Sequence, residues 1–160
     1  MAAAVVAFGA CAIKLDTGVS NALEILGFSD DGVHIEEHGM FHDIEGDQNG
    51  GQGGVPIEKQ FLGEQHFVRA TLTKYDPAVI NKITARVKGG TAGTMSTPGT
   101  MMSSNAYRLL LASAGGDRNY LIAIPIDVIA NNRGTKATRY SVSFVCYPNS
   151  SNVIYNAVNT

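Results

Sequence analysis

Two histidines and a glutamate near position 36 have the spacing of a zinc motif. His34, Glu37 and His38 form the pattern H-x-x-E-H, which on a helix would match the inverted zinc-protease signature. That chemistry needs both imidazoles on one helical face, whereas residues four apart on a strand lie about 13 Å apart and cannot share an ion. Val33 and Ile35 alternate with polar neighbours, which is typical of a half-buried strand. We therefore predict surface histidines and no metal site at this motif.

An acidic segment that follows resembles the beginning of a calcium-binding loop. It places side-chain oxygens at alternate positions, at Asp43, Glu45, Asp47 and Asn49. In such a loop the sixth residue is glycine and the twelfth is glutamate, but this sequence has Gln48 and Gly54 there. We therefore predict a solvated acidic loop rather than a calcium site.

The sequence contains no other recognisable motif of catalysis or cofactor binding. The glycine-rich stretches lack the G-x-x-x-x-G-K-[ST] pattern of a phosphate-binding loop, and no serine lies in a G-x-S-x-G pattern. Cys11 and Cys146 match neither a zinc nor a redox spacing, so we expect both to pack as small apolar side chains. The sequence predicts no catalytic residue, cofactor or metal, and a protein that works through its surfaces rather than as an enzyme.

The composition favours a strand-rich chain with little net charge. The chain has 160 residues, which suits one domain over residues 1–160, and 44% of them are apolar and 16% charged. The net charge of −2 gives no basic field of the kind that holds duplex DNA through its phosphates. The apolar N-terminal segment lacks the basic residues of a signal peptide, and no segment reaches the ~20 apolar residues of a membrane span. We expect a soluble protein, made in a cytoplasm, without a membrane partner.

Alternation of apolar and polar residues predicts a mainly β chain. The alternating segments are residues 5–16 with a break at Gly9, then 33–38, 56–62, 65–74, 107–112, 120–124, 126–130 and 138–147. Residues 21–28 fit either a short helical turn or another strand. Pro125 donates no ladder hydrogen bond, so we expect it to bend the sheet or to lie at its edge. The polar tail from Asn149 is expected to be loosely held.

Two of these strands, residues 56–62 and 65–74, are predicted to pair as a hairpin. Gly63 and Glu64 between them give a two-residue break with glycine first, which type II′ turns prefer. On the second strand, alternation puts three apolar residues on one face. These residues are Val68, Ala70 and Leu72.

One helix is predicted after this hairpin, at about residues 77–88. Asp76 is a natural N-cap, Pro77 suits the first helical position, and Gly89 and Gly90 are expected to end the helix. We expect its apolar stripe to pack against the sheet and Lys82 to be exposed. The stripe consists of Val79, Ile80, Ile83 and Val87.

Two long glycine-rich loops interrupt the pattern. Residues 45–54 contain no large apolar residue, and residues 89–105 form a loop that is longer than most loops of compact domains. The second loop carries Met95, Met101 and Met102. Methionine adapts to irregular partner surfaces, so we predict that this loop contacts a neighbouring subunit.

The order of these features resembles the tail tube proteins of long-tailed bacteriophages. In that family a strand beginning D-G-V-x-I leads to an acidic segment and a loop, and then to a strand that opens near a proline, here PIEKQ. A long strand ending in L-T and a helix begun by an acidic residue follow, here YDPAVINKI, and RGTKATRYSVSFVCYP is similar to the family's closing strand. The resemblance covers residues 31–88 and 119–148.

The resemblance implies a β-barrel or sandwich with one flanking helix, assembled into hexameric rings that stack into a tube. The protein would then belong to the virion tail and be assembled in the host cytoplasm. Its main partner would be further copies of itself, with sheath, baseplate or neck proteins as others. DNA would pass through the tube without specific binding, because an acidic channel repels phosphate. The candidate channel-lining residues are Glu36, Glu37, Asp43, Glu45, Asp47, Glu58 and Glu64.

Two other classes of protein stay open at this point. One is a capsid decoration protein, which clamps shell subunits, usually as a trimer. The other is a small enzyme or a ligand-binding barrel, which would be a persistent monomer with a deep pocket. The symmetry of the oligomer separates these classes from a tail tube.

Overall fold

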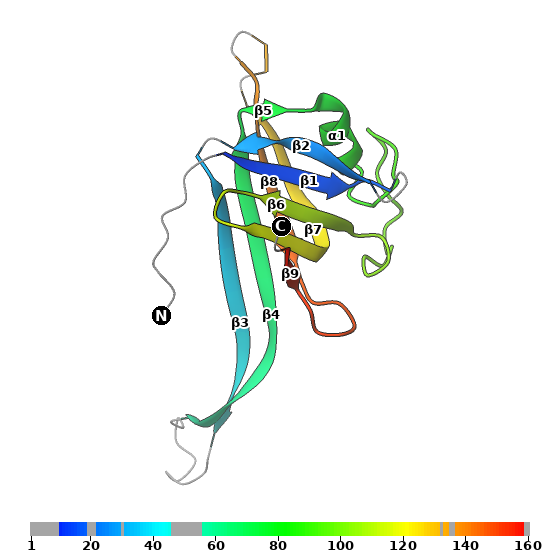
Figure 1. The fold of residues 1–160 in the computed structure, drawn as a ribbon. Helices are drawn as coiled ribbons and strands as arrows, with labels where there is room; N and C mark the ends of the chain where they lie inside the picture. The colour runs from blue at the N-terminus through cyan, green and yellow to red at the C-terminus, as the bar shows by residue number, and fades with distance from the viewer. Residues whose placement is uncertain are drawn as a thin grey trace.

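The computed structural model describes residues 10–18, 22–29, 31–45, 56–131, 133–134 and 137–158. Within these ranges the chain is mainly antiparallel β-structure with a single short helix, α1 (Pro77–Ile83) (Figure 1). The prediction of a mainly β fold with one helix is confirmed. No helix in this part of the chain is long and apolar enough to cross a membrane. The strand predicted over residues 5–9 and the loop at 46–54 lie outside the described residues.

Nine strands of the described chain form one sheet in which neighbouring strands are antiparallel. They are β1 (Cys11–Asp16), β2 (Leu23–Ser29), β3 (Val33–Glu45), β4 (Pro56–Leu72), β5 (Lys74–Tyr75), β6 (Tyr107–Ala112), β7 (Asp117–Asn131), β8 (Arg139–Cys146) and β9 (Tyr155–Val158). Their order across the sheet is β3-β4-β8-β7-β6-β1-β2-β5, and β9 pairs with β7.

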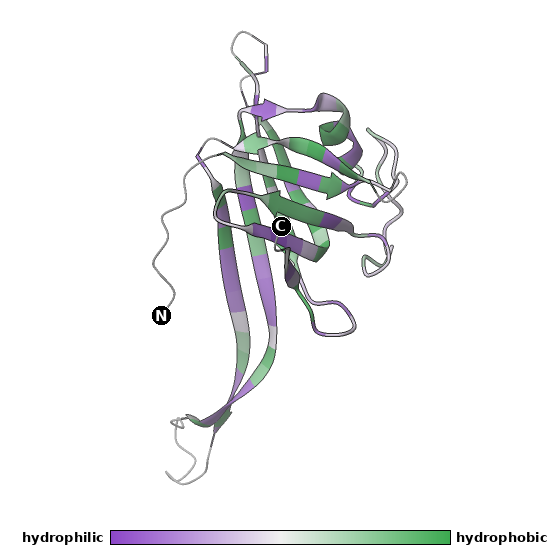
Figure 2. Ribbon diagram, in the orientation of Figure 1, coloured by the Kyte–Doolittle hydropathy of each residue, from purple (hydrophilic) through white to green (hydrophobic). Residues whose placement is uncertain are grey.

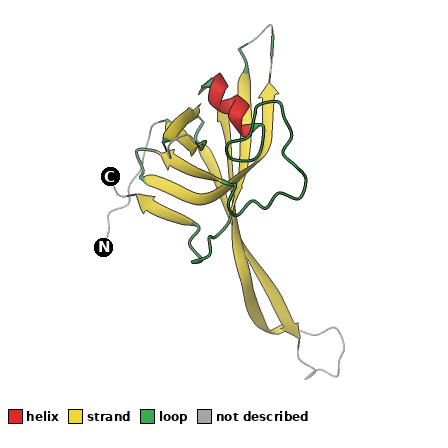
Figure 3. Ribbon diagram, turned by 90° about the vertical axis from the view of Figure 1, so that its right-hand side faces the viewer, coloured by secondary structure: helices red, strands yellow, loops and turns green. Residues whose placement is uncertain are grey.

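The sheet curls back on itself without closing. β5 follows β4 after a single residue, Thr73, and pairs with β2 at the far end of the strand order. Gly27 permits this pairing, because a Cβ atom there would lie 2.5 Å from the carbonyl oxygen of Lys74. No ladder joins β2 to β4 among the described residues, so the predicted barrel or sandwich is realised as an open, curled sheet (Figure 3).

The core lies inside the curl. It brings apolar residues of β1, β2 and β6 together with those of β4, β8 and α1. Burying one Leu, Ile or Phe side chain contributes roughly 1.5–3 kcal/mol relative to leaving it exposed, so this cluster is the main force that holds the curl. The largest fully buried members are Tyr107, Tyr120, Phe144, Ile13, Leu15, Leu26, Leu72, Ile80, Ile83 and Leu109.

Both cysteines are buried in this core and are free thiols. Burial raises the pKa of Cys146 to about 12, and it also raises the pKa of Cys11. Neither thiol is therefore ionised at neutral pH, and since the thiolate is the reactive form, both behave as the small apolar side chains that the sequence predicts.

The predicted hairpin at Gly63 and Glu64 is wrong. β4 is one continuous strand that pairs with β3 from Pro56 to Ala70, on both sides of Gly63. Gly63 lies at a β-bulge instead of a turn: Met40 pairs with Gly63 but Phe41 pairs with Phe61, which leaves Leu62 as the extra residue. The φ of 150° at Gly63 explains why glycine occupies the bulge.

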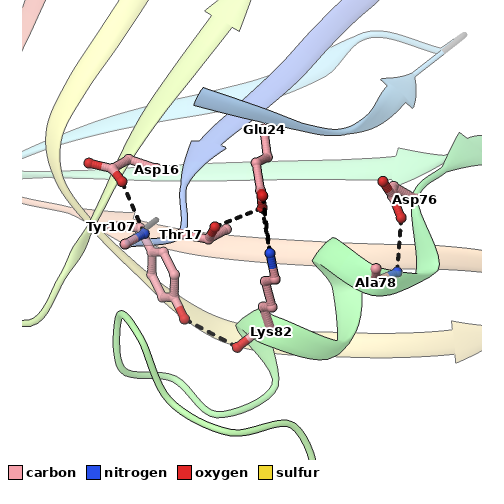
Figure 4. Close-up of polar contacts among 8 residues, drawn as sticks. Asp16, Thr17, Glu24, Asp76, Ala78, Lys82 and Tyr107 are labelled. Carbon is pink, nitrogen blue, oxygen red and sulfur yellow. Dashed lines mark hydrogen bonds and ion pairs between the residues drawn. The ribbon is translucent and has the colours of Figure 1, made fainter. Parts of the chain in front are cut away.

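The helix begins where the sequence predicts but ends earlier. The side chain of Asp76 accepts a hydrogen bond from the N–H of Ala78 at 2.9 Å, and Pro77 is the first helical residue (Figure 4). The prediction of a helix to about residue 88 is wrong, because α1 ends at Ile83 and Arg86 has a φ of 67°. An α-helix cannot continue through such a left-handed residue.

A tertiary contact accompanies this early end. The hydroxyl of Tyr107 lies 3.2 Å from the carbonyl oxygen of Lys82 in the last turn of α1 (Figure 4). It also lies 3.0 Å from the carbonyl oxygen of Val87, beyond the helix. Burial raises the pKa of Tyr107 to about 12, which keeps this donor protonated. Val87 was predicted to continue the apolar stripe but is half-buried in the segment after α1. The rest of the stripe is buried as predicted, at Val79, Ile80 and Ile83.

An ion pair ties α1 to β2. Lys82 Nζ lies 2.9 Å from Glu24 Oε2, and Thr17 Oγ1 donates to the same carboxylate at 2.7 Å (Figure 4). The hydrogen bonds from Thr17 and Lys82 lower the pKa of Glu24. The expectation that Lys82 is merely exposed is therefore wrong, since its ammonium is held by a specific partner.

In three other segments the observed structure settles or corrects a prediction from the sequence. Residues 21–28 contain a strand, β2, and not a helical turn. The strands predicted on either side of Pro125 are one strand, β7, with a register irregularity against β8 at that residue. The tail is not loosely held, because β9 pairs with β7 and the ring of Tyr155 lies 4.1 Å from the guanidinium of Arg118.

Replacing Ile83 with alanine should destabilise the protein. Its side chain is fully buried, and a large-to-small change at such a site costs about 2–5 kcal/mol. Asn81→Ala is the matched control: Asn81 is exposed on the same helix, and its loss should change the free energy of unfolding by about 0.5 kcal/mol or less. Denaturant unfolding measures both variants. Equal losses would show that the buried face of α1 is assigned wrongly.

Lys88 Nζ and Asp16 Oδ2 lie 2.7 Å apart, and this ion pair should make the free energy of unfolding depend on pH in the acid range. Burial raises the pKa of Asp16, but hydrogen bonds from Lys88 and from the N–H of Gly18 outweigh this and lower the pKa below its usual value. The ionised carboxylate therefore stabilises the fold at neutral pH, and this contribution is lost as the pH falls through the folded-state pKa. Lys88→Ala should cost about 1–3 kcal/mol at neutral pH.

Arg133→Ala controls for the loss of one positive charge, because Arg133 is exposed. Denaturant unfolding at neutral pH and at the lowest pH at which the fold persists measures both variants. The cost of Lys88→Ala should shrink at low pH, since a protonated Asp16 has no charge to pair. A cost that is the same at both pH values would contradict the assigned role of this pair.

Candidate functional site

The β3–β4 hairpin reaches beyond the rest of the sheet. β3 pairs with β4 over its whole length, but β4 pairs with β8 only between His66 and Leu72. Residues 39–45 and 56–64, which we call the arm, have no third strand beside them in the described chain. They project from the body as a two-stranded ribbon (Figures 1 and 3).

Large apolar side chains are exposed along the arm. They are Met40, Phe41, Ile44, Ile57, Phe61 and Leu62. Phe61 and Leu62 are each 60% exposed, and the rings of Phe41 and Phe61 lie across the ribbon with centroids 5.6 Å apart. Figure 2 shows apolar segments continuing along the arm, away from the core. Because a two-stranded ribbon alone is marginally stable and exposed apolar clusters mark interaction sites, the arm is the strongest candidate for contact with another chain.

One face of the hairpin base carries a charge network centred on Glu36. Its carboxylate lies 2.6 Å from Arg69 Nη1, 3.1 Å from His34 Nε2 and 3.2 Å from His38 Nε2. Hydrogen bonds from His38 and Arg69 lower the pKa of Glu36 to about 2, so the carboxylate is ionised at neutral pH. The H-x-x-E-H segment is a strand, as predicted, and its two histidines flank this one carboxylate.

The other face of the hairpin base holds a second cluster around His66. This residue is 2% exposed, with Glu64 Oε1 3.3 Å from its Nε2 and Glu37 Oε1 3.9 Å from its Nδ1. Glu37 Oε1 also lies 2.9 Å from Arg118 Nη1. Among the described residues, Glu37, Glu64 and His66 are the one group of three His, Cys, Asp or Glu side chains whose ligand atoms all lie within 4.8 Å of one another.

Sequence analysis missed His66, although the signal was present. His66 precedes three apolar residues at a spacing of two, which were predicted to share one face and are all buried, at Val68, Ala70 and Leu72. A histidine in phase with buried residues faces the same side of the sheet. His66 differs from the exposed His34 and His38 because it alternates in step with buried residues, and not because it belongs to a metal-binding motif.

The carboxylates predicted to line a channel do not share one face of the hairpin. Alternation places Glu37, Asp43, Glu45 and Glu64 on the side of His66, and Glu36 and Glu58 on the other side. Three of them have cationic partners: Glu36 with Arg69, Glu37 with Arg118 and Asp43 with Lys59. Asp47 lies outside the described residues. The lining of a channel by these residues therefore stays a prediction.

The loop at residues 89–105 has neither helix nor strand and lies beside the segment that follows α1 (Figure 3). Ser96 Oγ donates to the carbonyl oxygen of Ala85 at 2.7 Å, which anchors the loop to the body. Its role as a contact between subunits stays a prediction. Its methionines are Met95, 81% exposed, Met101, 74% exposed, and Met102, which is half-buried.

The fold can be compared with known proteins. No protein-family model and no curated protein matches the sequence. A chain from the tail of an empty gene transfer agent particle, determined by helical refinement with C6 symmetry, has a TM-score of 0.53 and 12% identity, covering 92% of this chain and 95% of that chain. A chain from the virion of the native gene transfer agent particle has a TM-score of 0.54 and 9% identity. The similarity covers 93% of this chain and 95% of that chain.

A solved Hcp protein is also similar, with 9% identity over 96% of this chain and 100% of that chain, but its TM-score of 0.31 carries no argument. Identities this low bear on the fold alone. The two gene transfer agent structures show that this chain shares its fold with a chain from the tail of such a particle, which agrees with the fold that the sequence resemblance predicts.

Proposed function

We propose that the protein is a structural subunit of a tail tube and not an enzyme. Six copies form a ring, rings stack into a tube in the virion tail, and DNA passes through the channel without specific binding. Sheath, baseplate or neck proteins are further partners, and assembly takes place in the host cytoplasm. The proposal is supported by the fold, which is similar to that of a chain in a C6-symmetric tail.

The arm is the observation that carries this proposal. Its apolar side chains project beyond the body, so another copy of the chain is the simplest means to bury them. Seven residues of β3 lie in the arm, and at ~3.3 Å per residue they extend about 20 Å past the third strand. This reach suits a contact with an adjacent subunit or with the next ring.

The two edges of the curled sheet also favour closed assembly. β3 is an edge strand of 13 residues, and β5 ends the other edge of the strand order. A long edge strand presents backbone donors and acceptors that pair with another chain unless they are covered. In a ring, head-to-tail contacts between identical copies cover every such edge without leaving a free end.

The charges of the arm agree with a channel that does not hold DNA. Glu45 and Glu58 are exposed and belong to none of the ion pairs among the described residues. The chain has a net charge of −2. Carboxylates around a channel repel phosphate, which is the reverse of the lysine and arginine contacts that bind nucleic acid.

Replacing the two most exposed apolar residues of the arm should prevent assembly. The wild type should form six-fold rings or tubes in negative-stain microscopy, whereas Phe61→Ser/Leu62→Ser should remain monomeric in light scattering. Both side chains are 60% exposed in the single chain, so the free energy of unfolding of the monomer should change little. Gln60→Ser, an exposed polar neighbour on β4, is the control and should assemble like the wild type.

Three outcomes would count against this assignment. A wild-type trimer would favour a capsid decoration protein. A monomer at high concentration under all salt conditions would exclude a self-assembling tube. Rings formed equally well by the double variant would place the subunit contacts elsewhere than on the arm.

Charge reversal at the arm should change what the assembled particles retain. Glu45→Lys/Glu58→Lys particles should copurify with nucleic acid, because the two residues lie on opposite faces of the hairpin and the lysine on the face toward the channel can neutralise a phosphate. Glu45→Gln/Glu58→Gln, which removes the same negative charges without adding positive ones, is the control and should stay free of nucleic acid. The ratio of absorbance at the nucleic-acid and protein maxima measures this retention.

The dependence of assembly on salt concentration is a second test of the same charges. Like charges around a ring repel one another, so the wild type should assemble more readily as salt rises from low to physiological strength. The Gln control should lose this dependence. Particles of the Lys variant without nucleic acid, together with salt-independent assembly of the wild type, would contradict an acidic channel.

A further inference from the structure

We propose that the arm of one copy binds in a cleft of a second copy, between the loop at residues 89–105 and the segment that follows α1. This contact rests on the proposed tail tube function and identifies the surface that receives the arm. The cleft, which we call the loop cleft, is lined by residues 84–87 of the segment after α1 and by loop residues 93–97, 99, 100 and 102.

The loop cleft suits an aromatic occupant. Its volume is about 580 Å³, within the roughly 300–1,000 Å³ of clefts that hold drug-sized ligands. Ala85 and Val87 line it from the segment after α1, and Met95 and Met102 line it from the loop. Methionine adapts to the shape of its partner, and its sulfur makes favourable contacts with aromatic rings. An aromatic side chain is therefore the group that these residues receive best.

Hydrogen bonds hold the two sides of the loop cleft in place. Ser96 Oγ donates to the carbonyl oxygen of Ala85 at 2.7 Å, which joins the loop to the segment after α1. The N–H of Lys88 donates to the carbonyl oxygen of Asn105 at 2.9 Å, which ties together the two ends of the loop. A site formed in advance loses less conformational freedom when it binds a partner, and this favours affinity.

The arm presents a matching aromatic pair. Phe41 and Phe61 lie opposite each other in the β3–β4 ladder, and they are 57% and 60% exposed. Their ring centroids are 5.6 Å apart, so the two rings form one compact surface. Aromatic residues that become buried often dominate the energy of a protein interface. This pair is therefore the part of the arm that we place in the loop cleft.

The charges of the two surfaces are complementary. Among the described residues, Arg86 is the one charged residue that lines the loop cleft, and it takes part in no ion pair. Opposite charges on two surfaces favour their encounter and fix their orientation. The arm is acidic, since Lys59 is its one lysine and its carboxylates are those of Asp43, Glu45, Glu58 and Glu64.

The arm cannot fill the cleft of its own chain. It projects from one end of the body, whereas the loop lies at the side of the body next to α1 (Figures 1 and 3). The contact therefore joins two different surfaces of two copies, head to tail. Repetition of such a contact builds a closed ring or an open stack, and a tube contains both.

Photo-crosslinking of the whole chain tests this contact. Phe61 is replaced by p-benzoyl-phenylalanine, which keeps an aromatic side chain and bonds to a neighbouring C–H group under ultraviolet light. In assembled particles the cross-link should join position 61 to residues 84–102 of another chain, as identified by mass spectrometry of the two-chain product. The same probe in place of Ile129, which is 52% exposed on β7, is the control and should not reach this segment.

Two methionine variants give an independent measurement. Met95→Asp places a charge in the lining of the loop cleft, whereas Met101→Asp places the same charge on the same loop outside the lining. These side chains are 81% and 74% exposed, so both variants should fold, which circular dichroism checks. Met95→Asp should raise the protein concentration needed for assembly by about tenfold or more in light scattering, because its charge would be buried in the contact. Met101→Asp should assemble like the wild type.

The results separate this contact from the tail tube function itself. Six-fold rings of the wild type would support the function, but this contact would be overturned if cross-links from position 61 map outside residues 84–102 or lie within one chain. Equal assembly of the folded Met95→Asp and Met101→Asp variants would also overturn it. A wild type that stays monomeric would contradict both the proposed function and this contact.

Discussion

The register of β4 is set by the burial of every second side chain, and much of the molecule depends on it. Val68, Ala70 and Leu72 are buried, whereas Arg69 between them is exposed. A slip of one residue would turn Arg69 into the core, where its charge would have to be desolvated. The register against β3 and β8 is therefore strongly determined. β4 continues to Pro56, but register shifts at Leu62 and Ile57 interrupt its alternation, so the pairing with β3 decides which side chains of the arm share a face.

The curl of the sheet is the second consequence of burial, and it depends on several local contacts. Apolar residues at both ends of the strand order share one core, so the sheet must bend. Gly27 lets β5 approach β2, and the lysines of α1 and of the following segment pair with Glu24 and Asp16 of the opposite strands. These polar contacts set where the chain after β5 lies, while the apolar core provides most of the stabilisation.

Function in this protein is a property of surfaces that the core leaves uncovered. The arm and the β3 edge expose apolar side chains and backbone groups that a single copy cannot satisfy. The base of the hairpin is different, because Glu36 and Glu37 are neutralised by Arg69 and Arg118 on its two faces. The charges at the base thus hold the hairpin together, and the apolar groups farther out are available for assembly.

Sequence analysis was most successful where a signal is local. The period of two predicted the buried face of β4, and the cap formed by Asp76 and Pro77 predicted where α1 begins. Both depend on neighbours within a few residues. The resemblance to tail tube proteins likewise followed from the order of such segments, and it predicted the mainly β fold correctly.

Tertiary contacts decided the rest. Glycine is favoured both in a turn and in a bulge, so the sequence around Gly63 does not distinguish the two. The pairing of β4 with β3 on both sides of Gly63 selects the bulge. The end of α1 coincides with a hydroxyl from Tyr107, 24 residues beyond Ile83 in the sequence. The His66 cluster joins Glu37 of β3 to Glu64 of β4 and to Arg118 of β7. Sequence spacing cannot report such contacts, because they depend on which strands become neighbours when the sheet curls around its core.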